Sequence, residues 1–249
     1  MRGVILAGGT GSRLFPLTRG TNKHLLPVGR YPMVFYPLAR LAQAGIGEIL
    51  IVTSPDHIGA MAASLGSGSR FGVELTYRIQ DQPGGIAQAL SLARSFVRDD
   101  RCAVVLGDNV FQDDLKPYIE QYAHQAAGAK VFLKQVEDPE RFGVPEIQSG
   151  KIVTIEEKPR DPKSRYGVTG IYLYDPQVFD LIEAIPPSAR GEVEITDLNN
   201  AYAARSQLTF DVLPGWWIDA GTFESLAQAN ELARDETLSI FPSHSMEAR

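Results

Sequence analysis

Glycine, arginine and lysine residues near the start of the sequence have the types and spacing that bind phosphate groups. The stretch VILAGGTGSRLFPLT, residues 4–18, runs from apolar residues into three glycines and Arg13, and Lys23 follows ten residues later. Glycine lets backbone N–H groups approach a phosphate closely, and arginine adds a planar bidentate donor. A lysine supplies a second cation for a polyphosphate. The alternative is a strand that ends in an ordinary tight turn, followed by a merely solvated lysine.

The glycine-rich stretch differs from two common nucleotide-binding fingerprints. It lacks the third glycine of G-x-G-x-x-G, which argues against a dinucleotide-dependent dehydrogenase, and no lysine follows its last glycine as in G-x-x-x-x-G-K-[ST]. The sequence shows no Ser-His-Asp arrangement, and its four histidines lack metal-ligand spacing. By itself, the loop is therefore compatible both with phosphate binding and with an ordinary tight turn.

Two aspartates are candidate ligands of a hard cation. Asp108 directly follows the apolar run AVVLG, and Asp219 in WWIDAGT lies between an apolar segment and an expected helix. Magnesium typically takes one or two carboxylates together with phosphate oxygens and water, so two aspartates suffice. The alternative for each is a structural role, as the cap of a turn or of a helix.

Composition limits the classes of function. With 249 residues and a net charge of −6, the chain has no broad basic excess of the kind that binds nucleic acid. Cys102 is the only cysteine, which excludes an intrachain disulfide and a cysteine-built metal site. No apolar run approaches the roughly 20 residues of a membrane span, and no cleavable leader precedes the first strand. We expect a soluble, cytoplasmic protein that binds neither nucleic acid nor membrane.

The pattern of apolar runs predicts which elements position these residues. Strands are expected at residues 3–7, 49–53, 73–79, 103–106, 129–136, 144–148, 151–155 and 168–174. Helices are expected at residues 32–44, 85–97, 113–127, 176–184, 195–205 and 222–234. This alternation predicts an α/β fold, a Rossmann-like three-layer sandwich with a mixed, mostly parallel central sheet and a smaller lobe. Pro145 must lie at an edge or bulge, and the tail at 239–249 is expected to be loosely held.

Seven stretches in order along the chain resemble the sugar-1-phosphate nucleotidyltransferase family. They are MRGVILAGGTGSRLFPLT, VLGDN, DPERFGV, EEKP, YGVTGIYLYD, PSARGEVEITDLN and WIDAGT, and the resemblance extends from residue 1 to about residue 234. It implies a Mg²⁺-assisted, in-line attack of a sugar phosphate on the α-phosphorus of a nucleoside triphosphate. The stretches are most similar to members that join dTTP and glucose 1-phosphate. UTP or another sugar 1-phosphate is the open alternative, and a non-catalytic nucleotide-sugar sensor is the alternative of another class.

The resemblance also implies roles for individual residues. The implied catalytic residues are Arg13, Lys23, Asp108, Lys158, Arg190 and Asp219, with Asp108 and Asp219 as the magnesium ligands. The nucleotide would be bound by Leu6, Gly8, Gly9, Thr10, Gly11, Ser12, Arg13, Lys23, Gln80, Gly85 and Asp108. The sugar phosphate would be bound by Asn109, Gly143, Glu157, Lys158, Val168 and Arg190. A glutamine at position 80 can accept from N3–H and donate to a carbonyl oxygen, the pattern of thymine or uracil.

The family pattern further implies one nucleotidyltransferase domain over residues 1–249. Residues 1–128 would mainly bind the nucleotide, residues 129–221 would mainly bind the sugar phosphate, and residues 222–249 would form a C-terminal helix and a tail. Familiar bacterial members continue beyond this point and use the extension for dimer contacts and a regulatory nucleotide site. Feedback inhibition and their tetramer are thus in question here, although a homo-oligomer, dimer or tetramer, is still expected. Asn22 and His24 stand where serine and glutamine are more common.

Overall fold

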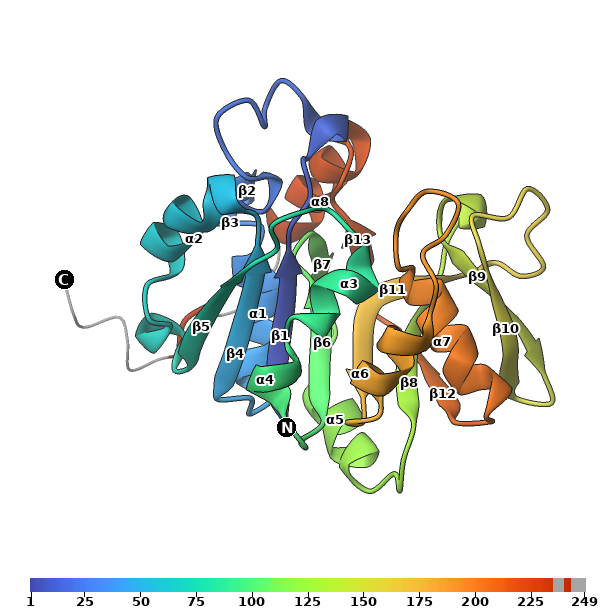
Figure 1. The fold of residues 1–249 in the computed structure, drawn as a ribbon. Helices are drawn as coiled ribbons and strands as arrows, with labels where there is room; N and C mark the ends of the chain where they lie inside the picture. Colours follow the sequence, from blue (N-terminus) through green and yellow to red (C-terminus); the bar gives the residue numbers. More distant parts are fainter. Residues whose placement is uncertain (235–239, 243–249) are drawn as a thin grey trace.

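A seven-stranded sheet forms the centre of the protein in the computed structural model, which describes residues 1–234 and 240–242 (Figure 1). The strand order is β12-β8-β11-β6-β1-β4-β5. In that order the bounds are Leu208–Val212, Ala129–Gln135, Tyr166–Tyr174, Cys102–Leu106, Arg2–Ala7, Glu48–Thr53 and Glu74–Ile79. Strand β11 runs antiparallel to both of its neighbours, while the other pairs are parallel. The predicted mixed, mostly parallel α/β sheet is confirmed.

Helices cover both faces of this sheet and complete the three layers (Figure 1). One face is covered by α1 (Phe35–Gln43), α2 (Ile58–Leu65), α5 (Lys116–Ala123) and α8 (Phe223–Arg234). The other face is covered by α3 (Ile86–Ser91), α4 (Arg94–Val97), α6 (Val178–Ala184) and α7 (Ile195–Ala204). Alternate residues of a strand point to opposite faces, so Ile5 packs in the first core and Val4 in the second. A strand that is buried on both faces needs apolar side chains on both, which is why residues 4–7 of β1 are all apolar.

A smaller lobe stands beside the sheet and is built on a two-stranded ribbon. Strands β9 (Gly143–Gln148) and β10 (Lys151–Glu157) pair antiparallel there, and β10 packs against α7. Pro145 lies opposite Ile155 in this ribbon. Because each strand of a two-stranded ribbon has an unpaired edge, the predicted edge position of the proline is confirmed.

Two further short pairs of strands have no clear signature in the sequence. Strands β7 (Asn109–Phe111) and β13 (Trp217–Asp219) pair antiparallel, as do β2 (Pro27–Val28) and β3 (Tyr31–Pro32). Runs of two or three residues are too short to show a period, which also explains why they were not predicted. Strand β12 and helix α2 are likewise absent from the sequence-based prediction.

The helices differ from expectation mainly at their ends. Helix α1 begins at Phe35 rather than at residue 32, because Tyr31 and Pro32 pair with β2. The single helix expected at 85–97 is two, since the N–H of Ala93 bonds to Leu90 and starts a new turn. Helix α5 covers only Lys116–Ala123 of the expected 113–127.

Residues 240–242, the part of the C-terminal tail that the structure describes, pack against the core. Ile240 is buried in the core beside α1, and Phe241 packs against Tyr31, Phe35 and Phe71. For residues 240–242 the expectation of a loosely held tail is therefore wrong, while residue 239 and residues 243–249 lie outside the described residues. Among the helices described, none has the length and apolar character needed to cross a membrane.

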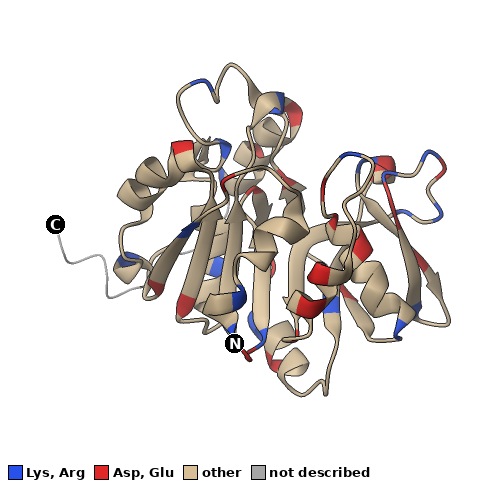
Figure 2. Cartoon of the chain, in the orientation of Figure 1, with Lys and Arg blue, Asp and Glu red and all other residues tan. Residues whose placement is uncertain are grey.

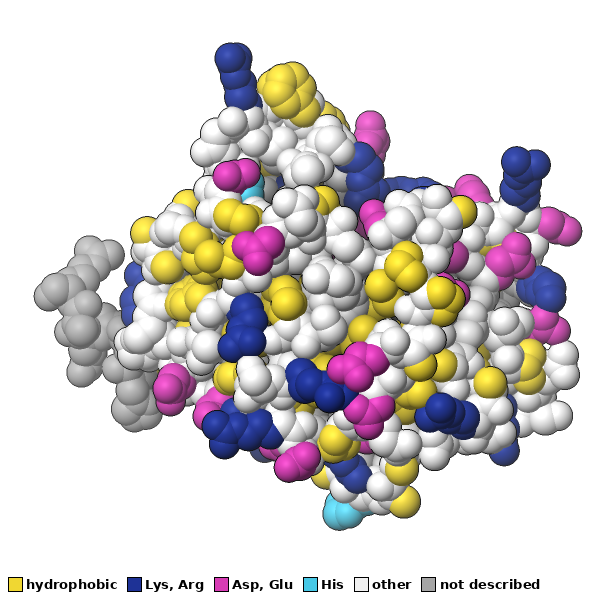
Figure 3. All heavy atoms as spheres, in the orientation of Figure 1, with side chains coloured by type: hydrophobic (Ala, Val, Ile, Leu, Met, Phe, Trp, Pro, Cys, Tyr) yellow, Lys and Arg dark blue, Asp and Glu magenta, His cyan; other side chains and the backbone are white. Residues whose placement is uncertain are grey.

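Charged residues of both signs are interspersed over the surface. Basic and acidic segments alternate along the loops above the sheet and the lobe (Figure 2). On the face drawn in Figure 3, lysine and arginine side chains are scattered among acidic ones rather than gathered into one patch. This distribution is consistent with the net charge of −6.

Candidate active site

A cleft of about 370 Å³ lies where the first strands end and the smaller lobe begins. Ligands of open α/β sheets bind at the carboxyl ends of the strands, and β1, β5 and β6 all lead to this cleft. The predicted site residues that line it are Leu6, Gly8, Gly9, Arg13, Lys23, Gln80, Gly85, Asp108, Asn109, Gly143, Glu157, Lys158, Val168, Arg190 and Asp219. Thr10, Gly11 and Ser12 do not line it. The structure thus brings both predicted groups of residues to one cavity.

The glycine-rich loop needs glycine at two positions for steric reasons. Gly11 has a φ of 64°, in the left-handed region, and starts the short 3-10 turn that carries Arg13. A Cβ on Gly11 would lie 2.8 Å from Cγ2 of Thr18, and a Cβ on Gly8 would lie 2.8 Å from Oε1 of Gln80. Gly8 therefore leaves room for the side chain of Gln80, whereas Gly11 allows the sharp turn that precedes Arg13.

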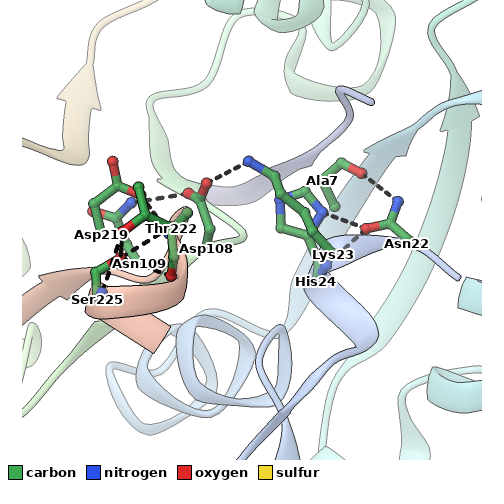
Figure 4. Close-up of polar contacts among 10 residues, drawn as sticks. Ala7, Asn22, Lys23, His24, Asp108, Asn109, Asp219, Thr222 and Ser225 are labelled. Carbon is green, nitrogen blue, oxygen red and sulfur yellow. Dashed lines mark hydrogen bonds and ion pairs between the residues drawn. The ribbon is translucent and has the colours of Figure 1, made fainter. Parts of the chain in front are cut away.

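Asp108 and Asp219 meet because β7 and β13 pair. In that ladder Asp219 lies opposite Asn109, and the N–H of Ala220 donates to the carbonyl oxygen of Asp108 at 2.9 Å. Both side chains face the same region in Figure 4, with Lys23 on the far side of Asp108. Two carboxylates that are far apart in the sequence are thereby held side by side.

The two carboxylates have opposite electrostatic environments. Nζ of Lys23 lies 2.5 Å from Oδ2 of Asp108. Burial favours the neutral acid, but the charge of Lys23 and the hydrogen bonds from Lys23 and Asn109 outweigh it and hold the pKa of Asp108 well below its usual range. Burial and the charge of Asp108 raise the pKa of Asp219 to about 6. The direct ion pair of Lys23 is thus with Asp108, while the charges of Lys23 and Arg13 oppose the rise of the Asp219 pKa.

The two carboxylates fit a magnesium ion that also binds oxygens of a substrate phosphate. No group of three or more histidine, cysteine, aspartate or glutamate residues suited to a metal occurs among the residues described. Two neighbouring carboxylates are what magnesium uses when substrate phosphate and water supply the remaining oxygens. The residues that could hold the ion are therefore Asp108 and Asp219.

Arg13 reaches the same place from the glycine-rich loop. A Cβ on Gly221 would lie 2.8 Å from Nη2 of Arg13 and 2.9 Å from Oδ1 of Asp219. The absence of a side chain at Gly221 thus leaves room for both groups. The exposed guanidinium of Arg13 faces the cleft beside the paired carboxylates.

Asn22 and His24 fix the turn that carries Lys23. Oδ1 of Asn22 accepts from the N–H of His24 at 2.8 Å and lies 2.6 Å from its Nδ1 (Figure 4). Nδ2 of Asn22 donates to the carbonyl oxygen of Ala7, the last residue of β1, at 3.1 Å. Burial and the charge of Lys23 lower the pKa of His24 to about 3, so its ring is neutral. The two departures from the family pattern therefore tie Lys23 to the central sheet.

Asn109 is held in one orientation beside Asp108. Its Oδ1 accepts from Nε1 of Trp217 at 2.7 Å and from the N–H of Gly170 at 2.9 Å. Its Nδ2 donates to Oδ1 of Asp108 at 3.2 Å. Two donors on the oxygen leave the amide nitrogen to face the carboxylate and the cleft.

The residues on the lobe side are paired with nearby carboxylates. Nζ of Lys158 lies 3.2 Å from Oε1 of Glu157, whose Oε2 accepts from Oγ1 of Thr196 at 2.7 Å. Nη2 of Arg190 donates to Oε1 of Glu194 at 2.8 Å. The side chains of Lys158 and Arg190 are about half exposed, at 52 % and 54 %, so an anion in the cleft can reach them.

Several lining residues escaped prediction. They are His24, Pro83, Ile86, Ala89, Leu106, Arg141, Phe142, Gly170, Tyr172, Glu192, Glu194, Ile195, Thr196, Asn199 and Trp217. Trp217, Glu194 and Arg141 stand inside the motifs that carry the family resemblance, so those motifs contained a usable signal. Asn199 also stands inside one of these motifs, whereas Ala89 lies on a helix with an ordinary apolar pattern.

A glycine-rich loop, paired carboxylates and two lobe cations around one cleft define an α/β enzyme built to hold phosphorylated ligands. The model of the nucleotidyl transferase family matches residues 2–236. The chain belongs to that family and is a nucleotidyltransferase, as the sequence resemblance predicted.

Individual relatives have more specific names. The glucose-1-phosphate thymidylyltransferase of Neisseria meningitidis is 46 % identical over 92 % of this chain and 81 % of the relative. That of Mycolicibacterium smegmatis is 45 % identical over 94 % of this chain and 82 % of the relative. A crystal structure of a candidate glucose-1-phosphate thymidylyltransferase from Bacillus anthracis, in complex with sucrose, is 58 % identical. It superposes with a TM-score of 0.93 and covers 96 % of this chain and 97 % of that one.

Proposed function

We propose that the protein joins dTTP and glucose 1-phosphate to give dTDP-glucose and pyrophosphate. The observation that carries this proposal is that Asp108 and Asp219 line one cleft together with cations from two parts of the chain. Arg13 and Lys23 lie on the side of the glycine-rich loop, and Lys158 lies across the cleft on the lobe. Two anionic substrates can thus enter from opposite sides. The names of the curated relatives support dTTP and glucose 1-phosphate as these substrates.

This reaction needs a site that positions the two substrates and stabilises the developing negative charge, and it needs no general base. The sugar phosphate is already an anion, so its oxygen forms the new bond to the α-phosphorus without losing a proton. The bond from the α-phosphorus to the bridging oxygen breaks, and the electron pair leaves with pyrophosphate. Lys158 and Arg190 hold the attacking phosphate in line, while Arg13 and Lys23 balance the charge that develops on the leaving group.

Asp108 and Asp219 would hold a magnesium ion during this reaction. When bound, the ion supplies Lewis-acid stabilisation of the phosphate oxygens. The protein's own part is the rigid ladder of β7 and β13, which keeps both carboxylates at one spot. Asn109 steadies Asp108 by donating to its Oδ1.

The base would be recognised at the end of β5 and the sugar at the lobe. Gln80 and Gly85 lie together on one wall of the cleft and are proposed to bind the edge of thymine. Glu157, Gly143 and Val168 lie on the lobe wall and are proposed to contact the sugar. We thus propose that residues 1–128 mainly bind nucleotide and that residues 129–221 mainly bind sugar phosphate.

Pyrophosphate release tests the proposal directly. The protein is incubated with Mg²⁺ and glucose 1-phosphate, and dTTP is compared with UTP, CTP, ATP and GTP. We expect dTTP to be the best substrate, and UTP ahead of dTTP would assign the enzyme to uridylyl transfer. If no triphosphate reacts, other sugar 1-phosphates are substituted for glucose 1-phosphate. No release with any pair would overturn the proposal in favour of a nucleotide-sugar sensor.

A further inference from the structure

The side-chain amide of Gln80 is held in one of its two possible orientations. Nε2 of Gln80 donates to Oε1 of Gln88 at 2.6 Å and lies 3.5 Å from the carbonyl oxygen of Gly85. A backbone carbonyl only accepts hydrogen bonds, so the nitrogen of Gln80 is the atom that belongs on this side. The oxygen of the amide therefore points the other way, toward Gly8 and the cleft.

That oxygen is available to a ligand. Gln80 is buried, with 8 % of its surface exposed. Within the part of the chain that the structure describes, no donor reaches its Oε1. Among the described residues the buried side-chain oxygens without a partner are those of Asp113 and Gln207, so Oε1 of Gln80 is open to the cleft, where a ligand with an N–H group can donate to it. The wall of the cleft at Gln80 is therefore built to receive a donor.

We propose that Gln88 is a positioning residue that makes the site select bases carrying an N3–H group. This inference rests on the proposed function, in which Gln80 binds the base. Thymine and uracil both carry a donor at N3, which Oε1 of Gln80 accepts. Cytosine carries an unprotonated acceptor at N3, which would face that oxygen and be repelled. Gln88 thus makes the site prefer thymine and uracil over cytosine, although its own side chain does not contact the base.

The surroundings of Gln88 suit this indirect role. It lies on α3, two residues after the start of the helix, and it is not among the residues that line the cleft. Its side chain packs against Gly84, and a Cβ added to Gly84 would lie 2.9 Å from Cγ of Gln88. The carbonyl of Gly85 alone, at 3.5 Å, is too distant to hold the amide firmly. Without an acceptor at position 88, the amide of Gln80 can turn over and offer its nitrogen to the base.

The test is the preference for dTTP over dCTP, measured as the ratio of kcat/KM with glucose 1-phosphate and Mg²⁺. Gln88→Met keeps the length of the side chain but removes the acceptor, and we expect the ratio to fall about tenfold or more. Gln88→Glu retains an acceptor, so it should keep the ratio of the wild type. An unchanged ratio in Gln88→Met would overturn the proposal. So would an equal fall in both variants.

Equilibrium binding of dTTP and dCTP to the same variants separates this inference from the proposed function. If the wild type prefers dTTP and Gln88→Met does not, Gln88 sets the preference even where no turnover occurs. If the wild type binds both nucleotides equally, the inference is wrong whatever the enzyme's reaction. Gln80→Met should abolish the preference, and its failure to do so would count against Gln80 as the base reader. Circular dichroism checks folding, and Gln88→Ala replaces Gln88→Met should the latter not fold.

Discussion

Nζ of Lys23 lies 2.5 Å from Oδ2 of Asp108, so a proposed triphosphate cation and a proposed metal ligand neutralise each other in the protein without substrate. Both groups are largely buried, at 15 % and 9 % exposure of the side chain. A buried carboxylate needs such a partner, because desolvation otherwise outweighs the gain from ionisation. We therefore expect substrate and its metal to exchange these partners, with phosphate taking Lys23 and a divalent cation taking Asp108.

Lys23→Met should reveal this exchange. The substitution leaves the buried carboxylate of Asp108 without its ion-pair partner, at a cost of about 3 kcal/mol in the free energy of unfolding. Because the lysine no longer competes for Asp108, we expect MgCl₂ without nucleotide to raise the Tm of Lys23→Met more than that of the wild type. Thermal melts in EDTA and in MgCl₂ measure both effects.

A second buried lysine provides the matched control for that experiment. Lys130 pairs with Asp211 and with Gln121 at the opposite end of the sheet from the cleft. Lys130→Met should also destabilise the protein, but it creates no metal site, so MgCl₂ should not restore its Tm. Equal magnesium shifts in Lys23→Met and the wild type would show that Lys23 does not compete with the cation.

Arg13→Ala should slow the chemical step more than it weakens sugar-phosphate binding. The guanidinium stands beside Asp219, across the cleft from Lys158. Loss of one group that stabilises developing charge typically lowers kcat by about 10²–10³-fold. Single-turnover kinetics measures the step itself. Arg19→Ala removes the same charge from the same loop without touching the cleft and should react normally, whereas normal chemistry in Arg13→Ala would exclude the proposed role.

Much of the fold was predictable because it depends on local patterns. The central strands are continuously apolar since both faces are covered, and the glycines after β1 indicate a loop that approaches a ligand. The motifs then identified the family and half of the residues of the cleft wall. Boundaries were less predictable, because Tyr31 and Pro32 look like a helix start until their pairing with β2 is known.

The relations between residues could not be obtained from local patterns. The residues alone gave no sign that Asp108 and Asp219 are neighbours, which depends on the pairing of two three-residue strands. Gln88 lies on a helix with an ordinary sequence, and its importance becomes visible only through its bond to Gln80. Asn22 and His24 were noticed as unusual, but the bond between them and the bond from Asn22 to Ala7 at the end of β1 depend on how the chain folds.

Gly85→Ala should weaken both substrates together, because two loops of the cleft are joined at this point. The N–H of Val193 donates to the carbonyl of Gly84, and the carbonyl of Val193 accepts from the N–H of Ala87. Gly85 has a φ of 95°, and its Cβ would lie 2.6 Å from the carbonyl oxygen of Val193. The substitution must push the loop of Arg190 away from the base-binding loop. We expect KM to rise several-fold for dTTP and for glucose 1-phosphate.

Gly45→Ala is the control for the strain of that substitution. Gly45 also has a positive φ, 85°, but no atom lies within 4 Å of its added Cβ. It should lower Tm without changing either KM. A rise in the KM of dTTP alone in Gly85→Ala would indicate that the two loops bind their substrates independently.

His24 should make the metal-free protein sensitive to acid. Burial, with the charge of Lys23, lowers its pKa from 6.5 to about 3 in the folded state, whereas the ring protonates near 6.5 in the unfolded chain. Between these values the unfolded state binds more protons, so stability falls as pH falls from about 7 toward 3. Between pH 7 and pH 5 this single group should cost about 2 kcal/mol.

His24→Gln isolates this effect, because a glutamine amide can donate to Asn22 and does not titrate. Carboxylates contribute to the pH dependence of both proteins, so the comparison is between their slopes. Urea unfolding in EDTA at pH 7 and pH 5 should show that the wild type loses about 2 kcal/mol more than His24→Gln over this interval. Parallel slopes would mean that the His24 ring is protonated inside the fold, beside Lys23. A charged ring there would place two cations around Asp108, and the proposed competition between Lys23 and a divalent ion would have to include the histidine.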